Sequence, residues 1–126
     1  MSFRSPLGQA RGLGSAREGT AHWVAQRVSA IALIPLTLWF VISMLMLVHA
    51  DYVTVVNWMH TTWVAVLLVL LVGTVYYHAY LGLQVVIEDY VHDAWLKMSS
   101  IILLRFICIL LAAAGIFVVL RVAFGG

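Results

Sequence analysis

One stretch of this chain combines two kinds of side chain that could do chemistry. Residues 78–90 read HAYLGLQVVIEDY, so a histidine in an apolar segment is followed, eleven and twelve residues later, by Asp89 and Tyr90. On a helix, His78, Gly82 and Asp89 share one face, with Asp89 roughly 16 Å along the axis from His78. A neutral imidazole can bind a metal, and a carboxylate beside a phenol can deliver a proton. The stretch therefore predicts a metal ligand deep in an apolar helix and a proton-handling pair at its polar end.

The composition indicates the kind of protein that holds this stretch. Of the 126 residues, 64% are hydrophobic and 10% are charged, and the mean hydropathy is +1.06. Such values are typical of an integral membrane protein and leave no room for a separate soluble domain. The net charge of +2 is small, which argues against a nucleic-acid partner. Cys108 is the only cysteine, so we expect it to be a small core residue rather than half of a disulfide.

Three apolar segments predict three membrane-spanning helices, over about residues 22–49, 61–88 and 94–124. We therefore expect an all-α integral membrane protein with one three-helix transmembrane domain over residues 21–126. Residues 1–20, rich in Gly, Ser and Arg, are expected to form an exposed N-terminal tail. The arginines precede the first span and the next connection has none, which predicts a cytoplasmic (or matrix) N-terminus and a C-terminus on the opposite side. The polar stretch 49–60 predicts a short loop with solvated histidines.

The polar residues inside the spans need partners. His78 lies about 6 Å from the predicted midplane, at a depth where a polar side chain is costly unless it is paired or functional. Arg27, about one turn into the first span, either extends to the lipid headgroups or pairs with an anionic group at the interface. Arg105 lies deeper still, so we expect it to have an internal partner.

These residues favour redox chemistry over covalent catalysis. Imidazole is a standard axial ligand of haem iron, and a helix bundle in a bilayer is a rigid, apolar place to hold a porphyrin. The other four histidines fall near the ends of the spans, so a second axial ligand would come from another chain, which predicts a hetero-oligomer. At the inner end, Tyr90 could donate a hydrogen bond to a quinone carbonyl, and Asp89 could orient that donor or deliver a proton.

The run from His78 to Tyr90 resembles the signature of a known family, the small D-type membrane anchor of succinate dehydrogenase, the cytochrome b556 subunit of respiratory complex II. In that family a histidine, a glycine four residues on and an Asp-Tyr pair occupy the second of three spans. A short basic tail and an arginine opening the first span, here Arg27 in the sequence QRVSAI, match as well.

The resemblance implies a role for each matched residue. His78 would be the axial ligand of a haem b shared with a companion C-type cytochrome b anchor subunit. Tyr90 and Asp89 would belong to the ubiquinone site, and Arg27 would lie near the haem propionates. The other partners would be a flavoprotein subunit, an iron–sulfur subunit and membrane lipid. The chain would not be an enzyme on its own, and its expected location is the bacterial inner membrane rather than the mitochondrial one.

Two alternatives remain open from the sequence. The chain could be the anchor of a quinol:fumarate reductase, which runs the reaction in the other direction. It could also be a small membrane subunit of another class, in which His78 and Asp89 form a proton path.

Overall fold

The computed structural model describes residues 16–125, which form four helices: α2 (Ala16–Leu47), α3 (Tyr52–His60), α4 (Thr62–Tyr90) and α5 (Ala94–Phe124). Three segments are long and apolar enough to cross a membrane, namely Gly19–Leu47, Thr62–Tyr90 and Ala94–Phe124. At 1.5 Å per residue each exceeds the hydrocarbon thickness of about 30 Å. The prediction of an all-helical protein with three membrane-spanning helices is therefore confirmed.

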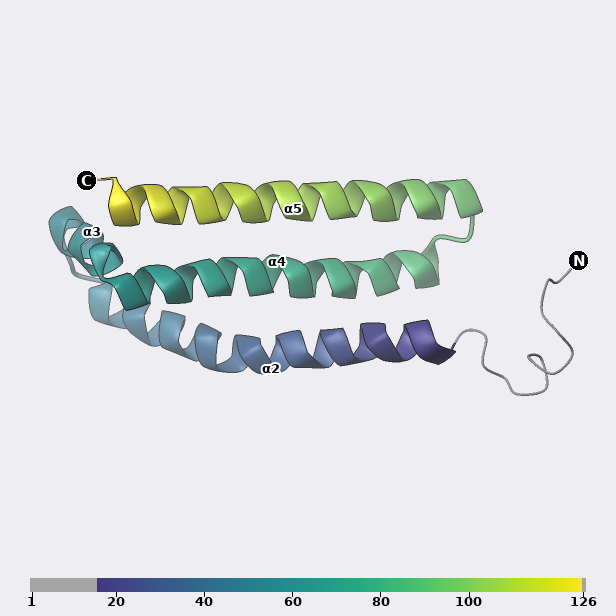
Figure 1. Cartoon of the computed structure of the whole chain (residues 1–126), viewed down its shortest axis with the longest axis horizontal. Helices are drawn as coiled ribbons and strands as arrows, with labels where there is room; N and C mark the ends of the chain where they lie inside the picture. Colours follow the sequence, from purple (N-terminus) through teal and green to yellow (C-terminus); the bar gives the residue numbers. More distant parts are fainter. Residues whose placement is uncertain (1–15, 126) are drawn as a thin grey trace, which may run out of the picture.

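The helix boundaries agree with the sequence except at the start of α2. α5 has the predicted bounds, and α4 runs two residues beyond its predicted end. α2 begins at Ala16, so the last five residues of the expected 1–20 tail are helical, while residues 1–15 lie outside the described part of the chain. The helix begins early because the sequence AREGTA contains good helix formers and no proline. Pro35 lies inside α2, which remains one helix and curves along its length (Figure 1).

The predicted loop over residues 49–60 is wrong, because most of it is the short helix α3. Asp51 caps this helix by accepting a hydrogen bond from the backbone N–H of Thr54 at 3.1 Å. Hydrogen bonds from the Thr54 side chain and backbone hold the pKa of Asp51 below its usual value. α3 also packs on its neighbours through a stack of Trp58 on Trp39, with ring centroids 5.9 Å apart. Capping and stacking explain why a polar segment is ordered here.

His60, expected to be a solvated loop residue, is instead the last residue of α3 and bonds the end of α5. Its Nδ1 lies 2.9 Å from the backbone oxygen of Ala123. A carbonyl can only accept, so Nδ1–H is the donor. The last four carbonyls of a helix lack partners within the helix, and His60 satisfies one of them.

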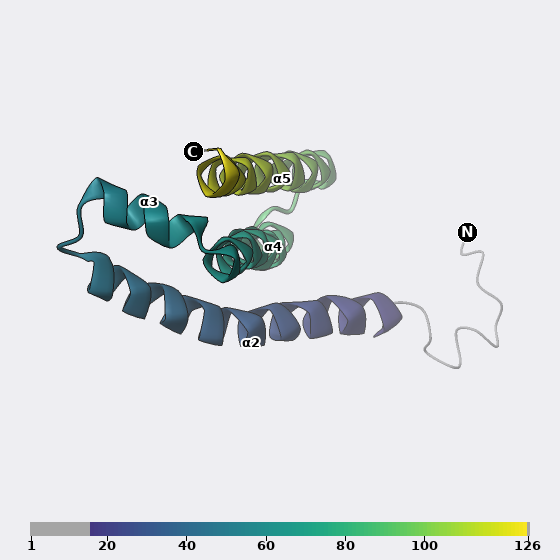
Figure 2. The same ribbon diagram turned by 60° about the vertical axis from the view of Figure 1, so that its left-hand side comes forward.

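The three long helices lie side by side with α4 in the middle, between α2 and α5 (Figures 1 and 2). α4 and α5 approach each other closely at Gly115 of α5. A Cβ there would lie only 2.9 Å from a methyl of Val72 on α4. Gly115 therefore lets α5 approach α4 closely, as small residues do between membrane helices. Cys108 is buried, as predicted. Most large apolar side chains of the described residues are exposed and available to lipid or to other subunits.

Candidate functional site

His78 lies half-buried on α4 and meets Ser29 of α2. Its Nδ1 is 2.9 Å from Ser29 Oγ, and Ser29 is only 5% exposed. The same hydroxyl donates a 3.0 Å hydrogen bond to the backbone oxygen of Gln26. The sequence predicted that a histidine at this depth needs a partner, and the structure identifies Ser29. Nε2 of His78 makes no hydrogen bond within residues 16–125.

Ser29 belongs to a polar stripe on α2 that the sequence reasoning missed. His22, Gln26 and Ser29 are spaced four and three residues apart, which places them on one helical face. Gln26 faces α4, because a Cβ on Gly82 would lie 3.5 Å from its Nε2. The i, i+4, i+7 spacing of these three residues was the available signal, although it lies inside a segment whose mean composition is apolar.

Two atoms of this stripe are buried without a hydrogen bond in the described structure: Nε2 of His22 and Oε1 of Gln26. A buried polar atom left without a partner costs about 1–3 kcal/mol. Such atoms occur where water or a bound group completes the site. The α2–α4 contact between His78 and the start of α2 is therefore a polar seam in an otherwise apolar bundle. We name it the α2–α4 seam, formed by His22, Gln26, Ser29 and His78.

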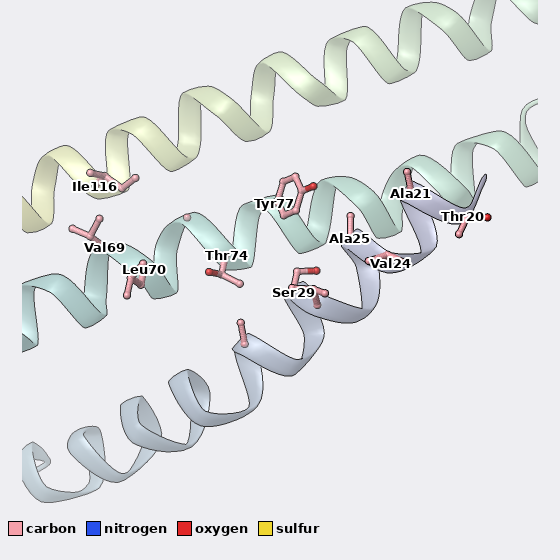
Figure 3. Close-up of a pocket in the computed structure, with 13 residues that line it drawn as sticks. Thr20, Ala21, Val24, Ala25, Ser29, Val69, Leu70, Thr74, Tyr77 and Ile116 are labelled. Atoms are coloured by element: carbon pink, nitrogen blue, oxygen red, sulfur yellow. The ribbon is translucent and has the colours of Figure 1, made fainter. Parts of the chain in front are cut away.

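An apolar groove runs beside this seam. Its volume is about 1320 Å³, and α2, α4 and Ile116 of α5 line it. Figure 3 shows Ser29, Thr74 and Tyr77 among the side chains along it. Ser29 therefore borders both the groove and the seam, whereas His78 is not part of the groove lining.

Arg27 follows Gln26 on α2 but faces a different direction. It is exposed, and its guanidinium carbon lies 5.3 Å from the centre of the Trp23 ring. Two residues along a helix correspond to about 200° of rotation, so Arg27 and Ser29 lie on nearly opposite faces. The guanidinium is thus presented away from α4, towards whatever surrounds this chain.

Asp89 and Tyr90 are the last two residues of α4. Both are exposed, and Tyr90 is 78% exposed. Eleven residues of continuous helix separate Asp89 from His78, which corresponds to roughly 16 Å. The structure therefore keeps this pair apart from the histidine, at the end of α4 where the chain turns towards α5.

Arg105 has the internal partner that its depth predicted. From α5 it donates to the Tyr80 hydroxyl on α4, through Nε at 3.1 Å and Nη2 at 2.7 Å. Its guanidinium also lies over the Tyr80 ring, 5.3 Å from the centre. The two residues border a second hollow of about 360 Å³ between α4 and α5. Arg105 thereby joins the two helices within the span.

The donor set allows one type of metal site. Among residues 16–125, no three His, Cys, Asp or Glu side chains gather as ligands for a free ion. A single imidazole is enough for haem iron, because the porphyrin supplies four nitrogens of its own. His78 fits that role: Ser29 holds one ring nitrogen, and the other has no partner in the described chain. Fold and site together define a small multi-pass membrane protein with a histidine, His78, inside its helix bundle.

Comparison with known proteins gives the family. Residues 1–112 match the model of the succinate dehydrogenase/fumarate reductase transmembrane subunit. The chain is 36% identical over 115 residues to the succinate dehydrogenase hydrophobic membrane anchor subunit of Rickettsia bellii, covering 90% of this chain and 91% of the relative. It is 34% identical over 113 residues to that of Rickettsia conorii, covering 89% and 90%. It is 32% identical over 114 residues to that of Paracoccus denitrificans, covering 90% and 88%. No solved structure matches the chain.

The chain therefore belongs to the succinate dehydrogenase/fumarate reductase transmembrane subunit family. It is a membrane anchor subunit rather than a catalytic one, and an anchor implies catalytic subunits as partners. The family resemblance inferred from residues 78–90 is thus confirmed.

Proposed function

We propose that this chain anchors a succinate:ubiquinone oxidoreductase in the bacterial inner membrane and contributes His78 as an axial ligand to a haem b. A companion cytochrome b anchor subunit would supply the second ligand. A flavoprotein and an iron–sulfur subunit would dock at the inner side, where α4 ends and α5 begins. The arginines before the first span support an inner N-terminus.

One observation carries the haem assignment. His78 is held at Nδ1 by the buried Ser29 hydroxyl at 2.9 Å, and its Nε2 has no partner in residues 16–125. Metal-binding histidines commonly have this arrangement, with one nitrogen fixed by a hydrogen bond and the other free to ligate. A bound haem supplies a one-electron carrier inside the membrane. Ser29 would hold the ligand and limit its rotation, and Arg27 presents a cation outward, where it could pair with a carboxylate of the haem edge.

The pair at the end of α4 supports a quinone role. A quinone is reduced by two electrons and two protons that end on its carbonyl oxygens. Tyr90 can donate a hydrogen bond to such an oxygen, and Asp89 beside it can orient the phenol or pass a proton from water. Both side chains are exposed at the end of α4, where the proposed span would meet water and protons would be available.

The test of the haem assignment is the reduced-minus-oxidised visible spectrum of the purified complex with His78→Ala. We expect the b-type band to be lost or strongly weakened while the other subunits still co-purify. His49→Ala, an exposed histidine at the opposite end of the bundle, is the matched control and should leave the band unchanged. Full haem content in the His78 variant would refute the assignment.

The quinone assignment has a separate test. Tyr90→Phe should slow ubiquinone reduction by about a hundredfold or more, the usual scale for losing a group that transfers a proton, while succinate oxidation by an artificial acceptor is retained. Tyr52→Phe, equally exposed at the other end, is the control. Equal losses in both assays would show that Tyr90 acts on assembly and not on the quinone.

A further inference from the structure

We propose that Ser29 fixes the tautomer and ring orientation of His78, and so acts as the positioning residue for the haem ligand. This inference rests on the proposed function. It adds to the site a residue of α2 that contacts His78 itself, which the sequence did not predict.

The Ser29 hydroxyl has fewer hydrogens than hydrogen-bonding neighbours. It carries one hydrogen but lies within hydrogen-bond distance of two atoms, the Gln26 backbone oxygen at 3.0 Å and His78 Nδ1 at 2.9 Å. The carbonyl oxygen can only accept, so the hydroxyl hydrogen belongs to that bond. Ser29 Oγ is then an acceptor towards His78, and Nδ1 must carry the hydrogen between them.

The opposite assignment, in which the Ser29 hydroxyl donates to His78 Nδ1, leaves the hydrogen-bond network incomplete. If the hydroxyl donated to Nδ1, two oxygen acceptors would lie 3.0 Å apart with no hydrogen between them. Serine hydroxyls inside helices also commonly bond a carbonyl of the preceding turn, as this one does. The network is satisfied in full only when His78 is the Nδ1–H tautomer.

That tautomer places the free lone pair on Nε2. A neutral imidazole has one nitrogen with hydrogen and one without, so a hydrogen on Nδ1 makes Nε2 the ligating atom. The hydrogen bond also increases the basicity of the ligand and restricts the rotation of the ring. Because Ser29 is only 5% exposed, water does not compete for the bond.

The contact links two helices that are far apart in the sequence. Ser29 and His78 are 49 residues apart and lie on α2 and α4. The orientation of the haem ligand therefore depends on the packing of α2 against α4. A change that separates these helices would release the ring even though His78 itself is unchanged.

The chain offers a matched control, Ser43. It is also buried on α2, with 9% exposed, and its hydroxyl donates to the Trp39 backbone oxygen at 2.8 Å. No histidine contacts it in the described structure. Ser29→Ala and Ser43→Ala thus remove the same group from the same helix, and only the first removes a bond to the haem ligand.

The experiment uses the whole purified complex in detergent. Two quantities are measured. The first is the rate of haem loss to an excess of a haem-scavenging globin, and the second is the low-temperature EPR signal of the oxidised haem. We expect Ser29→Ala to lose haem about tenfold faster or more, in line with other substitutions around metal-bound histidines, and to shift the EPR signal. Ser29→Thr, which keeps the hydroxyl, should restore both values, and Ser43→Ala should match the wild type.

The outcomes separate this inference from the proposed function. Wild-type haem retention and an unshifted EPR signal in Ser29→Ala would overturn the role of Ser29. Retention of haem in His78→Ala would instead overturn the haem assignment itself. If the alanine variant does not assemble, Ser29→Cys keeps the size with a much weaker hydrogen bond. Equal haem loss in the Cys and Thr variants would then refute the inference, and faster loss in the Cys variant would support it.

Discussion

Adding one methyl group at Gly115 should loosen the contact between α4 and α5. A Cβ there would lie 2.9 Å from Val72 Cγ1, whereas carbon atoms in contact prefer about 3.5–4.0 Å. The two helices must then separate by roughly half an ångström or more, or Val72 must leave its preferred rotamer, which a β-branched residue in a helix resists. Overpacking of this kind costs about 1–3 kcal/mol. A cost of 1.4 kcal/mol is a tenfold change in an equilibrium constant.

The assay is the resistance of the purified complex to unfolding by SDS, followed by tryptophan fluorescence. Gly115→Ala should unfold at lower SDS. Gly73→Ala should not, because no atom lies within 4 Å of the added methyl. The double variant Gly115→Ala/Val72→Ala should be no less stable than Val72→Ala alone, since the clashing methyl is gone. Wild-type stability of Gly115→Ala, or no relief in the double variant, would show that the helices do not meet as described.

Three further predictions concern Arg27, His60 and Asp51. Arg27→Ala should reduce haem retention or shift the haem potential, with Arg27→Lys milder; no change would leave Arg27 a plain interfacial residue. His60→Ala removes the bond to the Ala123 oxygen and should speed hydrogen exchange at the end of α5, by an amount equivalent to about 1 kcal/mol. The pKa of Asp51 is lower in the folded chain than in the unfolded one, so its capping of α3 is present above roughly pH 4 and is lost as the pH falls through the folded pKa. Amide exchange of α3, corrected for intrinsic rate, should increase in that range and should be fast at any pH in Asp51→Ala.

The sequence predicted those features that depend on apolar length and local pattern. The three spans followed from hydropathy, and the bounds of α5 were correct because the charged and polar residues 88–93 clearly separate it from α4. α3 was missed because its polar residues resemble a loop. Its stability comes from the Asp51 cap and from the stack of Trp58 on Trp39, which is a contact between separate elements.

The site was predictable only in part for a similar reason. The depth of His78 required a partner, but nothing local identifies which residue 49 positions earlier provides it. That choice depends on the register between α2 and α4, which packing determines. The same holds for Arg105. Its depth in the span predicted that it has a partner, but the sequence did not predict that this partner is Tyr80.

The separation of Ser29 and His78 along the chain also determines the order in which the site can form during synthesis. α2 leaves the ribosome before α4 exists, and 49 residues separate Ser29 from His78. At about 5–20 residues per second, roughly 2–10 s pass between them. During that time the bond from Ser29 to Gln26, which lies within α2, keeps the hydroxyl paired in the lipid. The ring of His78 becomes oriented only once α4 has inserted beside α2, so in the proposed haem site the capture of haem would follow the insertion of α4.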